Sequence, residues 1–238
     1  MKPVRFHSWN VSPDEASAIQ INLRDKVQVQ PLPDEIHLVI GTSVAIDPNN
    51  DTIHAALVVL RFPDMELVER HGLSEKITFP YVRGLLAFRE APPLMKLMKR
   101  IQHKPDVILF HSHGLAHPRR FGLASHLGVL FDIPSLGVAD RVLVGYHDEI
   151  DLEKGHHAPL VHNGEEVGLA LRTKEGVSPV FISVGHKADL LTTMDFTLEC
   201  TTHYRRPEPI RQAHLAVEAQ RDGESIDIDV GGDQTTLF

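Results

Sequence analysis

Cysteine is nearly absent from this sequence, which has a single one, Cys200, among 238 residues. One thiol excludes an internal disulfide and any zinc site built from several thiolates, so we expect Cys200 to be a small buried apolar side chain. Long apolar runs are absent too: VILF and AALVVL are far shorter than the roughly 20 residues of a bilayer-spanning helix, and the first residues lack a signal peptide's apolar segment. The sequence predicts a soluble, cytoplasmic protein with no membrane partner.

Basic residues are also in deficit, since 24 Lys and Arg face 32 Asp and Glu for a net charge of −8. Such a balance argues at first against a nucleic-acid partner. The acidic excess lies at the C-terminal end, however, where no Lys or Arg follows Arg221. The near-neutral remainder can carry a local basic face, for which the candidates are the pairs Arg119/Arg120 and Arg205/Arg206.

The pattern of apolar and turn residues predicts the order of the elements. Ser12 caps a leading helix, and three β-branched stretches separated by turn residues predict consecutive antiparallel strands at 36–46, 52–62 and 65–77. A helical period follows over 82–101, which Pro92 and Pro93 should kink or divide. The remaining expected elements are a buried strand at 105–110, a helix at 118–131 with Pro118 in its first turn, a short strand at 134–139, a strand pair at 166–173 and 178–185, and a closing helix at 210–220.

Three antiparallel strands, a helix, a buried strand, a helix and another short strand is the order of the ribonuclease H-like fold. We therefore expect one α/β domain with a mixed central sheet over residues 1–220. The acidic, Gly-rich segment 221–238 should be a flexible tail, because it has little apolar surface to bury.

Histidines gather directly after the buried strand, in FHSHGLAHPR (110–119), where His111, His113 and His117 fall within seven positions. The carboxyl end of a central strand is where open α/β sheets usually bind ligands. We interpret His117 as a structural histidine that makes a hydrogen bond, and His126 as a residue that packs within the predicted helix.

Longer motifs make the chain resemble the endonuclease V family of deaminated-base (deoxyinosine) DNA repair nucleases. The matching stretches are ITFPYVRGLLAFRE (77–90), KPDVILFHSHGLAHPRRFGLASHLGV (104–129), IPSLGVA (133–139), LRTKEGVSPVFISVGH (171–186) and RRPEPIRQAH (205–214). The resemblance implies a ribonuclease H-like fold and a magnesium-dependent nuclease that cuts near inosine. Its metal ligands would be two aspartates and a glutamate, supported by a lysine and a late histidine.

The family's functional positions are only partly retained in this sequence. Glu90 of the FRE motif and His186 of SVGH match, whereas the first-strand aspartate is Ser43, the aspartate after the central strand is His111 and the lysine is Asp140. Losing two carboxylates argues against an ordinary Mg²⁺ site, because Mg²⁺ requires hard oxygen ligands.

Three interpretations of these catalytic candidates remain open. Glu90, His111 and Asp140 could hold a rebuilt metal site, with Mn²⁺, Fe²⁺ or Zn²⁺ favoured over Mg²⁺ by an imidazole ligand. Alternatively, Ser43 could act as a nucleophile without metal, with His111 as its base and Asp140 orienting that base. The third interpretation is a pocket that recognises nucleic acid but has lost its metal chemistry.

The stretch PYVRG (80–84) aligns with the family's wedge, which enters the base stack while the target base is extruded. Tyr81 retains the stacking ring, Val82 follows it, and Arg83 replaces a proline; the alternative is an aromatic turn that closes the third strand. Further expected nucleic-acid contacts are Gly114 and the pair Arg119 and Arg120, for which the alternative is a solvated surface pair. The partner would be DNA, with RNA left open.

The terminal QTTLF resembles the QLxLF-type peptide that binds the bacterial sliding clamp. Gln234 would be the anchor, and Leu237 and Phe238 would fill a groove on the clamp; an exposed Leu-Phe after a polar linker is unusual unless something buries it. The alternative is an arbitrary C-terminus. The resulting expectation is a divergent endonuclease V-like DNA repair protein that recognises altered bases and either cleaves nearby or is a clamp-recruited binding module.

Overall fold

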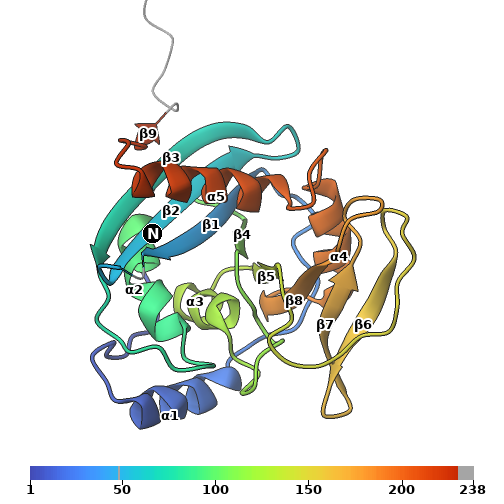
Figure 1. Ribbon diagram of the computed structural model, residues 1–238, viewed down its shortest axis with the longest axis horizontal. Helices are drawn as coiled ribbons and strands as arrows, with labels where there is room; N and C mark the ends of the chain where they lie inside the picture. Colours follow the sequence, from blue (N-terminus) through green and yellow to red (C-terminus); the bar gives the residue numbers. More distant parts are fainter. Residues whose placement is uncertain (48, 230–238) are drawn as a thin grey trace, which may run out of the picture.

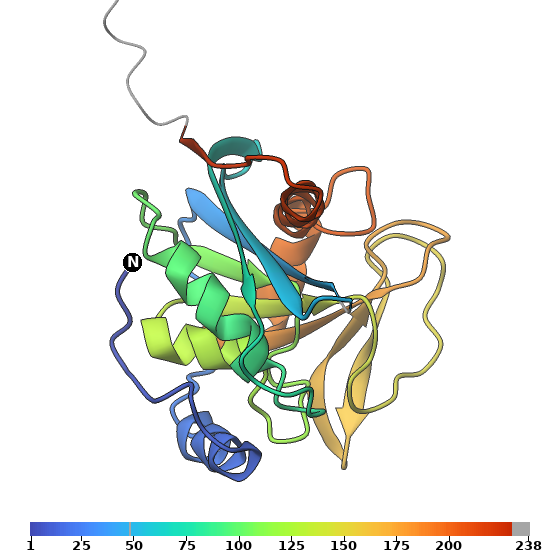
Figure 2. The same cartoon turned by 60° about the vertical axis from the view of Figure 1, so that its left-hand side comes forward.

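A central sheet organises the chain, seen in a computed structural model that describes residues 1–47 and 49–229. Within these residues, nine strands form one sheet in the order β6-β7-β8-β5-β4-β1-β2-β3-β9, and five helices surround it (Figure 1). Two apolar cores lie on its opposite faces, one beneath α2 and α3 and the other beneath α4 and α5 (Figure 2). This is the expected α/β architecture of the ribonuclease H-like fold.

The N-terminal half of the sheet follows the predicted strands. β1 (Leu38–Asp47), β2 (Thr52–Arg61) and β3 (Glu66–Lys76) are antiparallel neighbours. β4 (Val107–Phe110) lies parallel to β1, and β5 (Ser135–Ala139) lies parallel to β4. Because β1, β4 and β5 run in the same direction, the residues at or just after their carboxyl ends share one edge of the sheet.

The other half of the sheet contains one strand that the sequence pattern did not indicate. β7 (Glu165–Leu171) and β8 (Val180–His186) form the predicted strand pair, which is antiparallel, and β8 also pairs with β5. β6 (His157–His162) extends the sheet beyond β7. Its Pro159 and its mixture of polar and apolar residues concealed it, and both are tolerated because β6 is an edge strand.

The positions of the helices agree with the prediction better than their number does. α1 (Pro13–Arg24) has the predicted Ser12 cap, completed by Glu15 as a capping box. α2 (Ala87–Met98) contains Pro92 and Pro93 without being divided. α4 (Leu190–Glu199), which was not predicted, precedes α5 (Glu208–Arg221), the predicted closing helix.

The expected start of the third helix near Pro118 is wrong. α3 (Leu123–Phe131) begins five residues later, after Gly122. The chain cannot be helical before that point because Arg120 has a left-handed backbone, with φ 56°. Residues 111–122 therefore form a long irregular loop at the edge where β4 ends.

Helix α5 lies unusually close to β1, and Gly41 is the reason. A Cβ atom at position 41 would lie 1.9 Å from the carbonyl oxygen of Pro209, in the first turn of α5. A side chain there is incompatible with this packing. The contact holds the start of α5, and with it the preceding Arg205 and Arg206, beside the carboxyl ends of β1 and β4.

The ordered body extends past the predicted boundary at residue 220. Ile226 is buried against the α5 face of the sheet, and β9 (Ile228–Asp229) pairs with Glu69 and Arg70 of β3. Residues 221–229 of the predicted tail therefore belong to the ordered body, because Ile226 supplies an apolar anchor. The candidate clamp peptide at 234–238 lies outside the described residues. No helix in the described ranges is long and apolar enough to cross a membrane.

Candidate functional site

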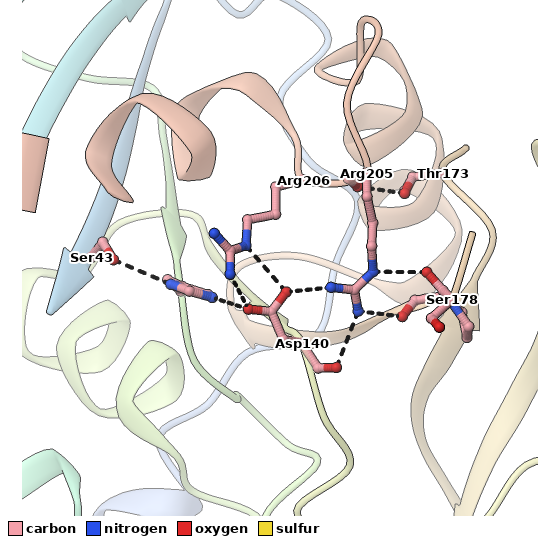
Figure 3. A network of polar contacts seen from close by, with 8 residues as sticks. Ser43, Asp140, Thr173, Ser178, Arg205 and Arg206 are labelled. Atoms are coloured by element: carbon pink, nitrogen blue, oxygen red, sulfur yellow. Dashed lines mark hydrogen bonds and ion pairs between the residues drawn. The ribbon is translucent and has the colours of Figure 1, made fainter. Parts of the chain in front are cut away.

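Ser43, His111 and Asp140 form a continuous hydrogen-bonded chain at the carboxyl edge of the sheet. His111 Nε2 lies 2.9 Å from Asp140 Oδ2, and His111 Nδ1 lies 3.2 Å from Ser43 Oγ (Figure 3). Because a carboxylate only accepts, Nε2 carries the proton, and in the neutral imidazole Nδ1 accepts from the Ser43 hydroxyl. The order of contacts is that of a hydrolytic triad.

Two arginines bind the same carboxylate. Arg205 Nη1 donates to Asp140 Oδ1 at 2.7 Å, and Arg206 Nη2 donates to Oδ2 at 2.6 Å, with its Nε 3.2 Å from Oδ1. Burial alone would raise the pKa of Asp140, but the hydrogen bonds from His111 and Arg206 outweigh it and hold that pKa well below its usual range. Asp140 is therefore ionised at any physiological pH.

His214 is a neighbour of this chain that the sequence analysis did not single out. It lies on α5, and its ring meets that of His111 edge-on with centroids 6.0 Å apart. Within the described residues no hydrogen bond to its ring nitrogens is found. Burial, followed by Arg206 and His111, lowers its pKa. The signal available in the sequence was the motif RRPEPIRQAH, which ends on this residue.

The structure does not bring His186 or Glu90 into this network. His186 Nδ1 accepts from the backbone N–H of Gln28, and its Nε2 lies 3.2 Å from Asp132 Oδ1, so both nitrogens are used in packing β8. Glu90, on the first turn of α2, makes no hydrogen bond or ion pair through its carboxylate to any described residue. Burial raises the pKa of Glu90 to about 7, opposed by the charge of Arg89.

The predicted metal-ligand set does not fit a divalent cation. His111 has both nitrogens engaged, and both carboxylate oxygens of Asp140 accept from guanidinium groups, which would repel a metal ion. Across the described ranges no three His, Cys, Asp or Glu side chains converge in a way that could hold a metal. This edge of the sheet instead holds the guanidinium groups of Arg205 and Arg206 and the carboxylate of Asp140.

A cavity of about 210 Å³ lies beside the network. Ser112 and Arg141, which directly follow His111 and Asp140, belong to its wall. The other lining residues are Gly84, Leu86, Ala87, His113, His117, Gly122, Leu123, Val142 and Leu143. His113 is neutral at pH 7, because burial lowers its pKa to about 4, and its buried Nδ1 has no hydrogen-bond partner among the described residues.

The predicted wedge leads to this cavity through Gly84, which belongs to its lining. Tyr81 is 69% exposed in the loop between β3 and α2, and Val82 packs against the buried cluster that contains Phe79 and Phe88. Arg83 Nη2 donates to the carbonyl of Leu143 at 3.0 Å, which ties the wedge to the opposite wall. Three side chains donate to the carbonyl of Gly84 at the base of the wedge: His117, Arg119 and Gln20, at 2.9, 2.6 and 3.2 Å.

On the neighbouring loop, the residues that were expected to contact nucleic acid instead contact other parts of the protein. Arg119 donates to Gly84 and Gln20, so it positions the wedge rather than facing solvent. Arg120 binds Glu165 and the carbonyl of His162 and so joins the loop to the β6–β7 hairpin. Gly114 is a close-packing position, where a Cβ atom would lie 1.9 Å from the carbonyl oxygen of Val184.

The remaining histidines of the cluster have structural roles, as predicted. His117 donates from Nε2 to Gly84, and its Nδ1 accepts from the backbone N–H of Arg119. His126 is fully buried within α3, with its Nε2 2.7 Å from that of His7. Cys200 is buried, as expected.

Taken with the fold, these features define a ribonuclease H-like α/β protein with a small cavity at the carboxyl edge of its sheet. The endonuclease V family model matches residues 21–215. Endonuclease V of Rippkaea orientalis is 44% identical over 200 residues, which cover 84% of this chain and 87% of the relative.

Solved structures agree with this assignment. Endonuclease V of Streptomyces avermitilis has a TM-score of 0.86 and 40% identity, covering 91% of this chain and 96% of its own. Endonuclease V of Ciona intestinalis, solved in complex with a 24mer DNA containing an inosine followed by a ribo-adenosine, has a TM-score of 0.76 and 28% identity, covering 88% of this chain and 98% of its own. The chain belongs to the endonuclease V family, which confirms the resemblance of its motifs.

The raised pKa of Glu90 predicts a pH-dependent stability difference. The native protein holds this proton up to about pH 7, whereas the unfolded chain releases it at the ordinary glutamate pKa, so the wild type loses stability as pH rises between those values. Glu90→Gln should therefore gain about 2 to 3 kcal/mol in free energy of unfolding relative to wild type between pH 4.5 and pH 8.

Urea unfolding at several pH values measures this difference. Glu224→Gln, which alters an exposed carboxylate after α5, is the matched control and should leave the pH profile unchanged. Parallel profiles for Glu90→Gln and wild type would show that Glu90 is ionised in the native protein.

Proposed function

We propose that this chain recognises a deaminated base in DNA, with Tyr81 as the wedge and the neighbouring cavity as the receptor for the extruded base. The observation that carries the proposal is an exposed aromatic ring in the loop that leads to Gly84, which lines a preformed cavity, in a family whose Ciona intestinalis member has been solved with inosine-containing DNA. Enzymes that act on a base commonly extrude it from the stack in this way.

The size and lining of the cavity support a single base as its occupant. Pockets for drug-sized ligands are roughly 300–1,000 Å³, so about 210 Å³ suits a smaller planar group. Leu86, Ala87 and Leu123 supply apolar contact, and Ser112 and His113 are polar members of the lining.

The geometry favours binding over cleavage. Ser43, the candidate nucleophile, is only 2% exposed, so a phosphodiester has little access to its hydroxyl. Both carboxylate oxygens of Asp140 also accept hydrogen bonds from guanidinium groups, so Asp140 is not reserved for orienting His111. Without a fitting metal site, the function that remains is recognition, the third of the interpretations drawn from the sequence.

Replacing Tyr81 tests the wedge. Tyr81→Ala should weaken binding to inosine-containing duplex by roughly 10-fold or more, because stacking of an aromatic ring on a base contributes about 1–3 kcal/mol. Binding to the matched duplex without inosine should change less, so the ratio of the two dissociation constants should fall. Fluorescence anisotropy in EDTA measures both.

Phe6→Ala is the control for this experiment. Phe6 is an aromatic residue that is 79% exposed and does not line the cavity. It should leave both affinities unchanged. Equal affinity of the wild-type protein for the two duplexes would refute base recognition.

Incubation of the same inosine duplex with Mg²⁺, Mn²⁺, Fe²⁺ or Zn²⁺ tests the absence of cleavage. We expect the DNA to remain uncut under each metal and in EDTA, because His111 and Asp140 are already occupied. Denaturing electrophoresis gives the result. Cleavage that disappears in both Glu90→Ala and His111→Ala would establish the rebuilt metal site instead.

The terminal QTTLF adds a proposed partner, the bacterial sliding clamp. Because QTTLF is covalently joined to the recognition domain, binding of a DNA-loaded clamp would make the contact with DNA effectively intramolecular, which raises the local concentration of the recognition domain on DNA. Deletion of residues 234–238 should abolish binding to purified clamp in surface plasmon resonance, and so should Leu237→Ala with Phe238→Ala. Thr236→Ala, between the anchors, is the control, and unchanged affinity of the deletion variant would contradict the proposal.

A further inference from the structure

The guanidinium of Arg206 has unused hydrogen-bonding capacity at the centre of the site. Its Nε and Nη2 donate to Asp140, whereas its Nη1 has no acceptor among the described residues (Figure 3). Arg205 differs, since its Nε donates to the carbonyl of Ser178 and its Nη2 to those of Asp140 and Pro179. Arg205 thus fixes Asp140, and Arg206 retains donors for a ligand.

The charge of this centre favours an anion. Two guanidinium groups and one carboxylate leave a net positive charge, even with His111 and His214 neutral. The side chain of Arg206 is 28% exposed, so a ligand can reach it. A fixed cation of this kind attracts phosphate, whose oxygens match the planar fork of arginine.

The place of this centre next to the cavity suggests which phosphate it meets. His111 and Asp140 belong to the charged centre, and the residues that follow them, Ser112 and Arg141, line the cavity. Consecutive Cα atoms are about 4 Å apart, so the charged centre and the cavity are immediate neighbours. A nucleotide has the same arrangement, a base on one side and a backbone phosphate on the other. His214 adds ring nitrogens that no described residue uses.

We propose that this centre binds a backbone phosphate of the nucleic acid directly through Arg206 and His214, with no divalent metal. Arg206 supplies the positive charge that a metal ion would otherwise supply, and Asp140 holds the guanidinium in place before the ligand arrives. Such preorganisation lowers the entropy lost on binding. The inference rests on the proposed function, because DNA provides the phosphate.

Salt dependence of DNA binding tests the inference. The affinity of the full chain for the inosine duplex should be the same in EDTA and in Mg²⁺ or Mn²⁺. Arg206→Gln should weaken binding roughly 10-fold and reduce the slope of log K against log salt by about 1, the signature of one lost phosphate contact. Arg206→Lys, which keeps the charge, should retain most of the slope.

Arg211→Gln is the matched control. Arg211 lies on α5, just after the segment that holds Arg206; it is 26% exposed and pairs with Glu208, so its replacement removes the same charge from an equally accessible ion pair. It should leave the slope unchanged, and thermal unfolding of each variant verifies folding. Equal slopes for Arg206→Gln and wild type, or equal losses in both variants, would overturn the inference.

Metal titration separates the remaining outcomes. Isothermal titration of wild-type protein with Mn²⁺ should show no stoichiometric site, and a site abolished by His111→Ala would also overturn the inference. Failure of the proposed function has a different signature, namely equal affinity for inosine and control duplexes. That result can occur with or without the loss of salt slope in Arg206→Gln, so the two ideas fail separately.

Discussion

The site depends on the carboxylate of Asp140 and the three donors that share it. His111 reaches it from the end of β4, and Arg205 and Arg206 reach it from the segment before α5, so one anion joins elements that are far apart in sequence. Leaving any of these groups unpaired would destabilise the folded state. A partly buried charge loses hydration, and without a partner no new interaction offsets that loss. Because these side chains hydrogen-bond to one another, several charged groups can lie close together at the edge of an apolar sheet.

That network has a geometric precondition in the backbone. Gly41 admits the first turn of α5 to within contact of β1, and without this approach the two arginines would stand away from Asp140. The wedge has a comparable precondition, since Gly84 adopts a left-handed φ of 80° and presents its carbonyl to His117, Arg119 and Gln20. Glycines thus decide where the charged and aromatic groups are placed.

Residue patterns predicted the central sheet well because its strands are either alternating or wholly apolar, and burial enforces such patterns. β6 and α4 escaped notice because an edge strand and a short helix with Thr and Asp bury too little to leave a clear period. The start of α3 was misplaced because Pro118 is compatible with a helix start, while the left-handed Arg120 is visible only in the structure.

For the site, the sequence identified which positions had changed but not how their side chains would pair. Ser43, His111 and Asp140 do meet, whereas His186 and Glu90 do not join them, and Arg119 turns inward. Partner choice among long side chains depends on where a loop carries each backbone, which local sequence does not encode. His214 illustrates the same limit, because its importance comes from the packing of α5 across β1 rather than from its own neighbours in sequence.

The short pairing of β9 with β3 determines where the last described residues lie. It fixes Asp229 beside Glu69, near the start of β3, whereas Tyr81 follows the far end of that strand. Seven residues of extended chain separate Glu69 from Lys76, roughly 23 Å at 3.3 Å per residue. The last described residues and the loop that carries Tyr81 therefore lie toward opposite ends of one strand, so substitutions at β9 and at the wedge should act independently of each other.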